Sequence, residues 1–422
     1  MTTDNRVTIA RAEDILGFIP HVLGRWPKES LVALTLRGRI LGATLRVDLP
    51  SDTSDDVLQA YTRKITEYLE TDHEADGALL AVFTDDGWDE GTVVRRHRPV
   101  LEALELSLAR HGLPLRDAWL IGAEFWRSAF CNDEECCPSP GRPIDEIRDS
   151  RLNAEMVFRG SNVNTPPLHG PGEQPANNPE FMALEEEALE AMMKIWQDEK
   201  AFEDVLDAWT LVLDAGVSEH LEADIAVFLR ASLRVPAWRD AVVVLAAAGR
   251  SAARGGAQAF RFFQNQGEDG EPLAIPPALR PLPASTGNAP RTPGLPHTST
   301  AARGPKRSRT VDIDALRYGE VLLGTYPESP LWHRLTTLDQ ALAVLARHGG
   351  GEARAAALTL RGWIQWCRGS GSFAVEFLSQ ADLEHPGYRL AELLNEVVRR
   401  GTVCGWAKKQ ASAWPKFGGA VA

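Results

Sequence analysis

Cysteine is scarce in this chain, which has five among 422 residues. A small, odd number of thiols over that length argues against a secreted scaffold held together by disulfides. Long apolar runs are lacking too, because Ala241–Ala248 falls far short of the ~20 residues that cross a bilayer. The first residues, Met1–Arg6, show no basic stretch leading into an apolar one, as a secretory signal would. We therefore expect a cytoplasmic protein.

Common catalytic signatures are missing as well. The chain has no Walker A sequence and no G-x-G-x-x-G between a strand and a helix, so no glycine-rich phosphate loop is indicated. Its histidines form no H-E-x-x-H group, and Ser30 does not stand in a G-x-S-x-G turn. These absences favour a non-catalytic role.

Positive charge is in the minority. Lys and Arg number 45 against 58 Asp and Glu, which gives a formal net charge of −13. Because DNA-binding proteins draw much of their affinity from Lys and Arg on phosphates, this balance argues against a protein that coats nucleic acid.

Residues 1–160 predict an α/β domain. Nearly continuous apolar runs are typical of strands covered on both faces, and the turn at Gly38 predicts a hairpin. Segments with helical spacing lie between the later strands. The strands that we expect are Ser30–Leu36, Ile40–Leu49, Ala78–Phe83 and Leu115–Ile121. The order ββαβαβ predicts a mixed, largely parallel sheet with helices packed on it.

Several stretches of this part are similar to an actinobacterial family of uncharacterised proteins, known as domain of unknown function 4192. They are Leu16–Pro20, Gly24–Val32, Leu45–Pro50 and Cys131–Pro138. The likeness extends over most of the chain. It implies a bacterial cytoplasmic protein and carries no activity with it.

The rest of the chain predicts an α-helical region in two segments, 181–265 and 310–422. The stretch 272–309 between them contains many prolines and no Asp or Glu, which predicts a disordered, basic linker. Four cations at its end are the residues that we expect to give any weak contact with nucleic acid: Arg303, Lys306, Arg307 and Arg309. A solvated tether is the plainer interpretation.

One helical hairpin, predicted over 355–388, resembles a tetratricopeptide repeat. Gly362, Ala374, Ala381 and Pro386 follow one another at intervals of 12, 7 and 5 residues. Small residues at such positions let two helices approach closely, and a proline closes the unit. Because the chain shows one such copy, we expect a repeat-like hairpin and not a solenoid. A protein partner of the helical region is the function that we favour.

Three of the five thiols stand close together, at Cys131, Cys136 and Cys137. Thiolates are preferred ligands of structural zinc, so a zinc site is one interpretation, with His169, Cys367 and Cys404 as distant partners. A redox pair is a second, although neighbouring carboxylates disfavour reactive thiolates. Packing of the cysteines as small apolar side chains is the third.

Acidic residues gather where two of the expected strands end, with Asp48 in the last residues of one and Asp85 and Asp86 just after the other. Open α/β sheets bind ligands beyond the carboxyl ends of their strands, where paired carboxylates can hold Mg²⁺. The alternative to an interaction or scaffolding protein is therefore a metal-dependent hydrolase or nuclease with these three carboxylates as its site.

Overall fold

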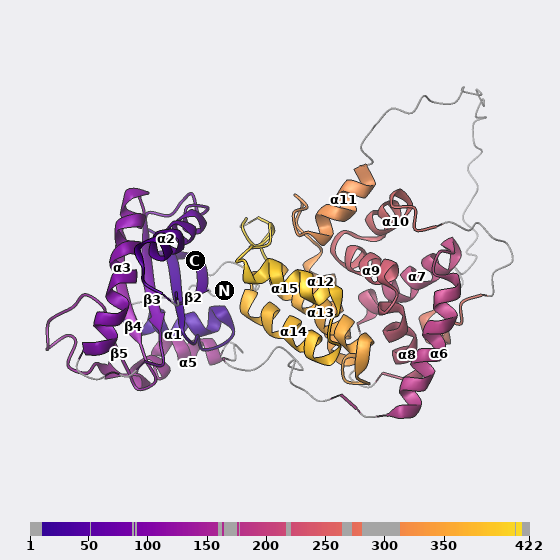
Figure 1. The fold of residues 1–422 in the computed structure, drawn as a ribbon, viewed down its shortest axis with the longest axis horizontal. Coiled ribbons are helices and arrows are strands. Elements are labelled where there is room, and N and C mark those ends of the chain that lie inside the picture. The colour runs from indigo at the N-terminus through magenta and orange to yellow at the C-terminus, as the bar shows by residue number, and fades with distance from the viewer. Residues whose placement is uncertain are drawn as a thin grey trace, which may run out of the picture. The chain divides into compact units, whose positions relative to one another are not determined.

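The computed structural model forms two compact units, one within residues 1–167 and 415–422 and the other within 168–414 (Figure 1). We describe each unit by itself. The residues that the structure describes are 11–50, 52–86, 88, 91–158, 163, 175–176, 178–216, 221–263, 272–280, 313–409 and 411–415. Among them, no helix combines the length and the apolar character needed to span a bilayer.

The first unit contains a six-stranded sheet in the order β2-β1-β3-β4-β5-β6. Its strands are β1 (Ser30–Arg37), β2 (Ile40–Asp48), β3 (Gly77–Phe83), β4 (Leu115–Ile121), β5 (Phe125–Ser128) and β6 (Arg142–Pro143). The helices of this unit are α1 (Ala12–Leu23), α2 (Asp55–Leu69), α3 (Thr92–Arg110), α4 (Asp145–Arg148) and α5 (Arg151–Phe158). The predicted mixed sheet with helices is confirmed.

The prediction that this sheet is largely parallel is wrong. Among the described strands, β3 and β4 form the parallel pair, and the other neighbouring pairs are antiparallel. The reason is the place of β1, which runs antiparallel to β2 on one side and to β3 on the other. Helix α2 therefore connects two strands that point the same way but are separated by β1.

The central strands bury side chains on both faces of the sheet, as their apolar sequences predict. On one face, Leu31 and Leu80 pack with Leu104 of α3 and Ile65 of α2. On the other face, alternate residues such as Val32 and Ala81 of the strands pack with α1 and α4. The result is a sheet between two helical layers (Figure 1). These layers leave the ends of the strands as the places where polar side chains gather.

The second unit is entirely helical over its described residues. Its helices are α6 (Pro179–Ile195), α7 (Glu199–Ala215), α8 (Ala223–Leu233), α9 (Pro236–Ala248), α10 (Arg250–Ala259), the 3₁₀ turn η2 (Pro277–Leu279), α11 (Ile313–Leu322), α12 (Trp332–Leu345), α13 (Gly351–Cys367), α14 (Gly371–Glu384) and α15 (Arg389–Arg399). The two helical segments expected from the sequence share one hydrophobic core.

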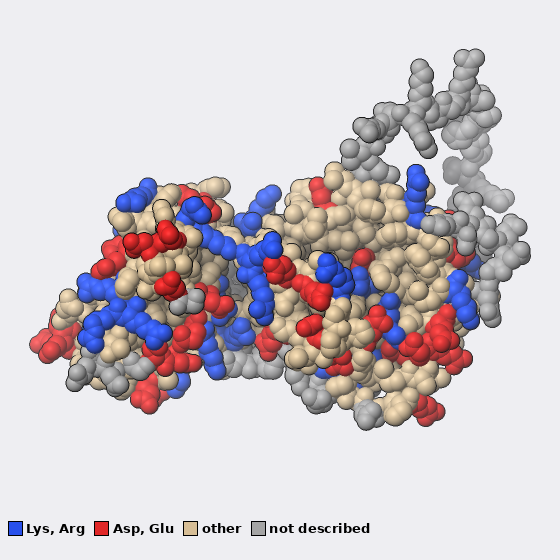
Figure 2. Space-filling view, viewed as in Figure 1, with Lys and Arg blue, Asp and Glu red and all other residues tan. Residues whose placement is uncertain are grey.

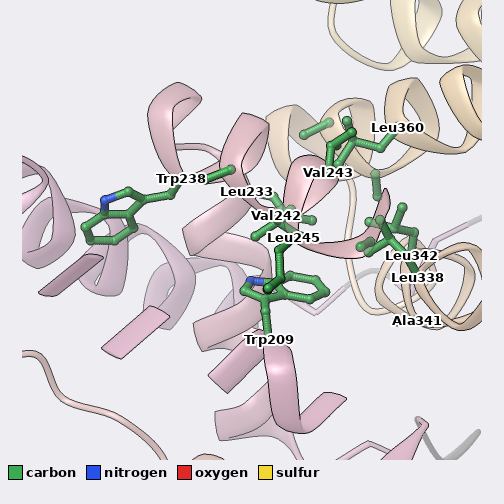
Figure 3. Close-up of a cluster of buried hydrophobic side chains, with 14 of the residues drawn as sticks. Trp209, Leu233, Trp238, Val242, Val243, Leu245, Leu338, Ala341, Leu342 and Leu360 are labelled. Atoms are coloured by element: carbon green, nitrogen blue, oxygen red, sulfur yellow. The ribbon is translucent and has the colours of Figure 1, made fainter. Parts of the chain in front are cut away.

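That core is centred on α9, which is buried along almost its whole length. Figure 3 shows side chains of α9 near Trp209 of α7 and near Leu338 and Leu342 of α12. A helix that is apolar on all sides needs neighbours on all sides, and here they come from both predicted segments. The helices on either side of the predicted linker therefore fold as one body.

The start of the predicted linker takes part in this body. Residues 272–280 include η2, and Leu279 is buried while Leu273 and Ile275 pack against the same core. Their apolar side chains outweigh the prolines that suggested disorder. The remaining predicted linker residues, 281–309, lie outside the described residues.

Helices α13 and α14 coincide with the predicted hairpin. Gly362 permits their close approach, because a Cβ atom there would lie 2.9 Å from Leu378 Cγ and 3.2 Å from the Ala374 carbonyl oxygen. Both Ala374 and Ala381 are fully buried. The small residues thus serve the close packing that their spacing predicts.

Candidate functional site

Two of the predicted acidic positions meet at one end of the sheet. Ser30, the first residue of β1, pairs with Asp48 of β2 and with Phe83 of β3. Asp48 is the last residue of β2, and Asp85 and Asp86 follow shortly after β3. The acids therefore lie at the same end of the sheet, as expected, although β1 separates the two strands that carry them.

Each of the three carboxylate residues has a different environment. Asp48 is exposed and pairs with Arg46, whose Nη2 lies 2.7 Å from Asp48 Oδ1. The Asp86 carboxylate pairs with two groups of α3, at 2.7 Å to Arg96 Nη1 and 3.0 Å to His97 Nε2. Asp85 is exposed and is held through its backbone amide.

These carboxylates do not form a metal centre of three ligands within the described chain. The group of His, Cys, Asp or Glu ligand atoms close enough to share an ion is found elsewhere, in the cysteine loop. The carboxylates of Asp48 and Asp86 are instead engaged in ion pairs with Arg46 and Arg96. A metal-dependent hydrolase built on Asp48, Asp85 and Asp86 stays a prediction.

What the edge does hold is a pocket of about 300 Å³. That volume is at the lower end of the range for small-molecule sites. The pocket is lined by Lys28, Glu29, Asp48, Leu49, Pro50, Thr53, Arg96, His97 and Val100. Its walls therefore combine apolar side chains from the end of β2 and from α3 with charges of both signs.

Glu29 connects the loop before β1 to the loop after β3. Its Oε1 accepts hydrogen bonds from the Asp85 amide at 2.5 Å and from Thr84 Oγ1 at 3.2 Å. Its backbone has a φ of 41°, a left-handed conformation that side chains other than glycine rarely adopt. Such strain is retained where the surroundings fix it, and it gathers at functional sites.

His97 is the buried polar group of the pocket. It lies on α3, one turn beyond the helix start, and is 6% exposed. Its Nε2 atom donates a hydrogen bond to Asp86 Oδ2 at 3.0 Å, which fixes the orientation of the ring. A buried imidazole oriented by a carboxylate is the arrangement that proton-transfer sites use.

Lys28 provides the remaining positive charge. It is exposed at the pocket and has no ion-pair partner among the described residues. Its carbonyl oxygen accepts a hydrogen bond from Arg46 Nη2 at 3.4 Å, so the main chain at this position is held while the ammonium group stays available.

Sequence reasoning missed Lys28, Glu29, Arg96 and His97 as one group. Asp86 and His97 are 11 residues apart along the chain and come together because a strand and a helix meet there. An isolated histidine in an arginine-rich helix gives no motif. The signal that was present is the position of the acids at strand ends, since Asp48 lines the same pocket.

The three clustered thiols meet in the loop after β5. The Sγ atoms of Cys131, Cys136 and Cys137 all lie within 4.8 Å of one another. Cys131 is half-buried, Cys136 exposed and Cys137 buried, and all three are free thiols. The distant candidates Cys367 and Cys404 lie in the helical unit, and His169 lies outside the described residues.

The surroundings shift the pKa values of two of these thiols in opposite directions. The backbone amide of Asp133 donates to the Cys131 sulfur and lowers the pKa of that thiol. Burial raises the pKa of Cys137 to about 11. At Cys131 the Asp133 amide outweighs the charge of the Asp133 carboxylate, so the net direction of the pKa shift is downward.

The predicted nucleic-acid contacts, Arg303, Lys306, Arg307 and Arg309, lie outside the described residues. On the described surface in Figure 2, blue and red side chains are interspersed. Neither sign forms one continuous field over this face.

A protein-family model, Domain of unknown function (DUF4192), matches residues 13–261 and 332–403, well over half of the chain. The chain belongs to this family. The match includes the pocket and the cysteine loop of this DUF4192 member, and it extends over helices of the second unit. The unmatched stretch, 262–331, contains the whole predicted linker. No curated protein and no solved structure matches the chain.

Proposed function

We propose that the α/β unit of this DUF4192 member binds a small polar molecule that carries a carboxylate or phosphate group. The site is the pocket beside β2, β3 and α3. The observation that carries the proposal is a pocket lined both by buried His97, which pairs with Asp86, and by exposed Lys28, which has no ion-pair partner among the described residues.

The position in the fold supports this proposal. The loop that carries Asp86 follows β3, which belongs to the parallel pair β3–β4. In open α/β sheets, ligands bind beyond the carboxyl ends of such strands. Polar groups from three separate segments converge there on apolar walls, as small-molecule sites require.

The chemistry of the walls supports the class of ligand. Of the two Lys and Arg residues that line the pocket, Arg96 pairs with Asp86, whereas Lys28 has no ion-pair partner among the described residues. An anionic group of the ligand is therefore its natural counterion. Glu29 and Asp48 add acceptors for hydroxyl or amino groups. Since the charges of the pocket are balanced, a polyanion such as nucleic acid has little reason to bind there.

A protein partner for the helical unit and a cytoplasmic location, both expected from the sequence, remain predictions alongside this proposal. The five free thiols support a reducing compartment.

Thermal unfolding of the full chain tests the proposal with pyrophosphate, citrate and a hexose phosphate as probes and glucose as the uncharged comparison, at matched ionic strength. A ligand that binds the folded state raises the unfolding midpoint. We expect at least one anion to raise it for the wild type and for Arg98→Gln, and not for Lys28→Gln. Arg98 is the matched control because it lies on α3, pairs with Glu102 and does not line the pocket.

No response to any anion contradicts the proposal. An equal response of Lys28→Gln and Arg98→Gln contradicts it too, because it places the binding outside the pocket.

A further inference from the structure

We propose that Cys131, Cys136 and Cys137 form a Zn²⁺ site in the loop that follows β5. The proposal is independent of the ligand pocket. It rests on the positions of the three sulfur atoms, the hydrogen bonds that shape the loop and the charges around it.

The sulfur positions fit a single zinc ion. Three atoms that lie within 4.8 Å of one another leave a central point at most about 2.8 Å from each of them. A Zn–S bond is about 2.3 Å, so a movement of about half an ångström per thiol closes the site. Adjacent side chains usually point apart, yet here Cys136 and Cys137 both approach Cys131.

Backbone hydrogen bonds hold the loop in this shape. The Cys137 amide donates to the Asp133 carbonyl oxygen at 2.7 Å, and the Glu135 amide donates to Asp133 Oδ1 at 2.9 Å. Asp133 thus closes the turn that returns the chain from Cys131 to Cys136 and Cys137. Because the loop is already ordered, little conformational entropy remains to be lost when an ion binds.

The charged groups around the thiols suit a divalent cation held by sulfur. Arg127 donates through Nη2 to the Cys131 carbonyl oxygen at 3.0 Å, and its buried Nε has no hydrogen-bond partner among the described residues. Three thiolates and one Zn²⁺ carry a net negative charge, which this guanidinium compensates. The exposed acids Glu134 and Glu135 attract a divalent ion more strongly than a monovalent one.

The fourth coordination position is open. No fourth His, Cys, Asp or Glu of the described chain joins the three sulfur atoms within the same distance. Cys136 is exposed, so water or an outside ligand reaches that position. Zinc sites with three protein ligands keep such a position for exchange. We infer a zinc ion that ties the loop together and stays accessible from solvent.

Metal analysis of the full chain tests this inference, with the protein purified under reducing conditions and without chelator. We expect about one zinc ion per chain in the wild type and loss of that zinc in the double variant Cys131→Ser/Cys136→Ser. Cys404→Ser is the matched control, because Cys404 lies in the helical unit and a serine keeps a donor toward the Gly324 carbonyl oxygen. It should retain the zinc.

A titration of the reduced, metal-free chain with Co²⁺ gives a second readout. We expect the intense visible bands of tetrahedral cobalt and thiolate-to-cobalt charge transfer in the wild type and in Cys404→Ser, and neither in the double variant. Two results overturn the inference: a chain that contains no zinc and gives no such bands, or zinc and bands that persist in the double variant. Circular dichroism should show that the double variant is folded, since Cys131 and Cys136 are not buried.

Discussion

Arg230 and Glu185 form an ion pair in the interior of the helical unit, with Arg230 Nε 2.5 Å from Glu185 Oε2. The side chains are 0% and 1% exposed. The same guanidinium donates to the carbonyl oxygens of Leu345, Gly349 and Gly350 at 2.7–2.9 Å. It therefore joins α6 and α8, which precede the predicted linker, to the end of α12 and the connection between α12 and α13, which follow it.

Arg230→Met should destabilise the helical unit severely. The substitution leaves the Glu185 carboxylate buried without its partner and removes donors from three carbonyl oxygens, so we expect a loss of ~3–5 kcal/mol in the free energy of unfolding. Urea denaturation followed by tryptophan fluorescence measures it. Arg254→Met is the control, because Arg254 pairs with Glu199 and Glu203 at an exposed position where such pairs contribute ~1 kcal/mol or less. Equal losses in the two variants would contradict this role of Arg230.

Gly362→Ala should weaken the packing of α13 against α14. The new methyl group would approach Leu378 closer than real Cβ atoms do and would crowd the Ala374 carbonyl oxygen, so we expect a loss of ~1–3 kcal/mol. Gly319→Ala in α11 is the matched control. A Cβ atom there meets no atom within 4 Å, and alanine favours a helix over glycine by ~1 kcal/mol. The same denaturation experiment should show opposite signs, and a stabilising Gly362→Ala would disprove the close approach.

Asp72 makes the stability of the first unit depend on pH. It accepts from Thr35 Oγ1 at 2.5 Å and pairs with Arg37 Nη2 at 2.6 Å. Burial works to raise the pKa of Asp72, but hydrogen bonds from Thr35, Arg37 and the Ala43 amide together hold that pKa below the ordinary value of 3.8. Because the folded pKa is the lower one, the stabilisation is present above the unfolded value and is lost as the pH falls through the folded value.

Asp72→Asn should therefore reduce stability at pH 6 and make less difference at about pH 3. That pH lies below the ordinary value of 3.8, so the unfolded chain already binds a proton at Asp72 and part of the stabilisation is lost. Urea denaturation at both pH values measures the two differences. Glu74→Gln is the control, since Glu74 pairs with the same Arg37 from an exposed position. A difference between wild type and Asp72→Asn that stays constant with pH would contradict the account of Asp72.

Local sequence was enough to predict the strands and most helices of the first unit. The apolar runs of β1 and β3 and the turn at Gly38 can be recognised from the neighbouring residues alone. Which strands become neighbours depends on long-range packing, and so the insertion of β1 between β2 and β3 was not predicted. In the second unit, proline content hid the contribution of Leu279, whose burial depends on helices far away in the sequence.

For the candidate site, the sequence predicted the edge but not the chemistry. Asp48 and Asp86 were expected as metal ligands, because nothing in the local sequence shows that Arg46 and His97 would face them. The cysteine loop differs: its three thiols lie within seven residues, and their proximity follows from the short loop itself.

The central claim, that a small anion binds beside His97, is tested most directly by NMR of the histidine rings. The probe is the anion that raises the unfolding midpoint most, titrated into the full chain. We predict that the His97 ring signals shift and saturate in the wild type and stay still in Lys28→Gln, while those of His333 in the helical unit do not move. If the anion binds and the His97 signals remain unchanged, the account of this pocket is wrong.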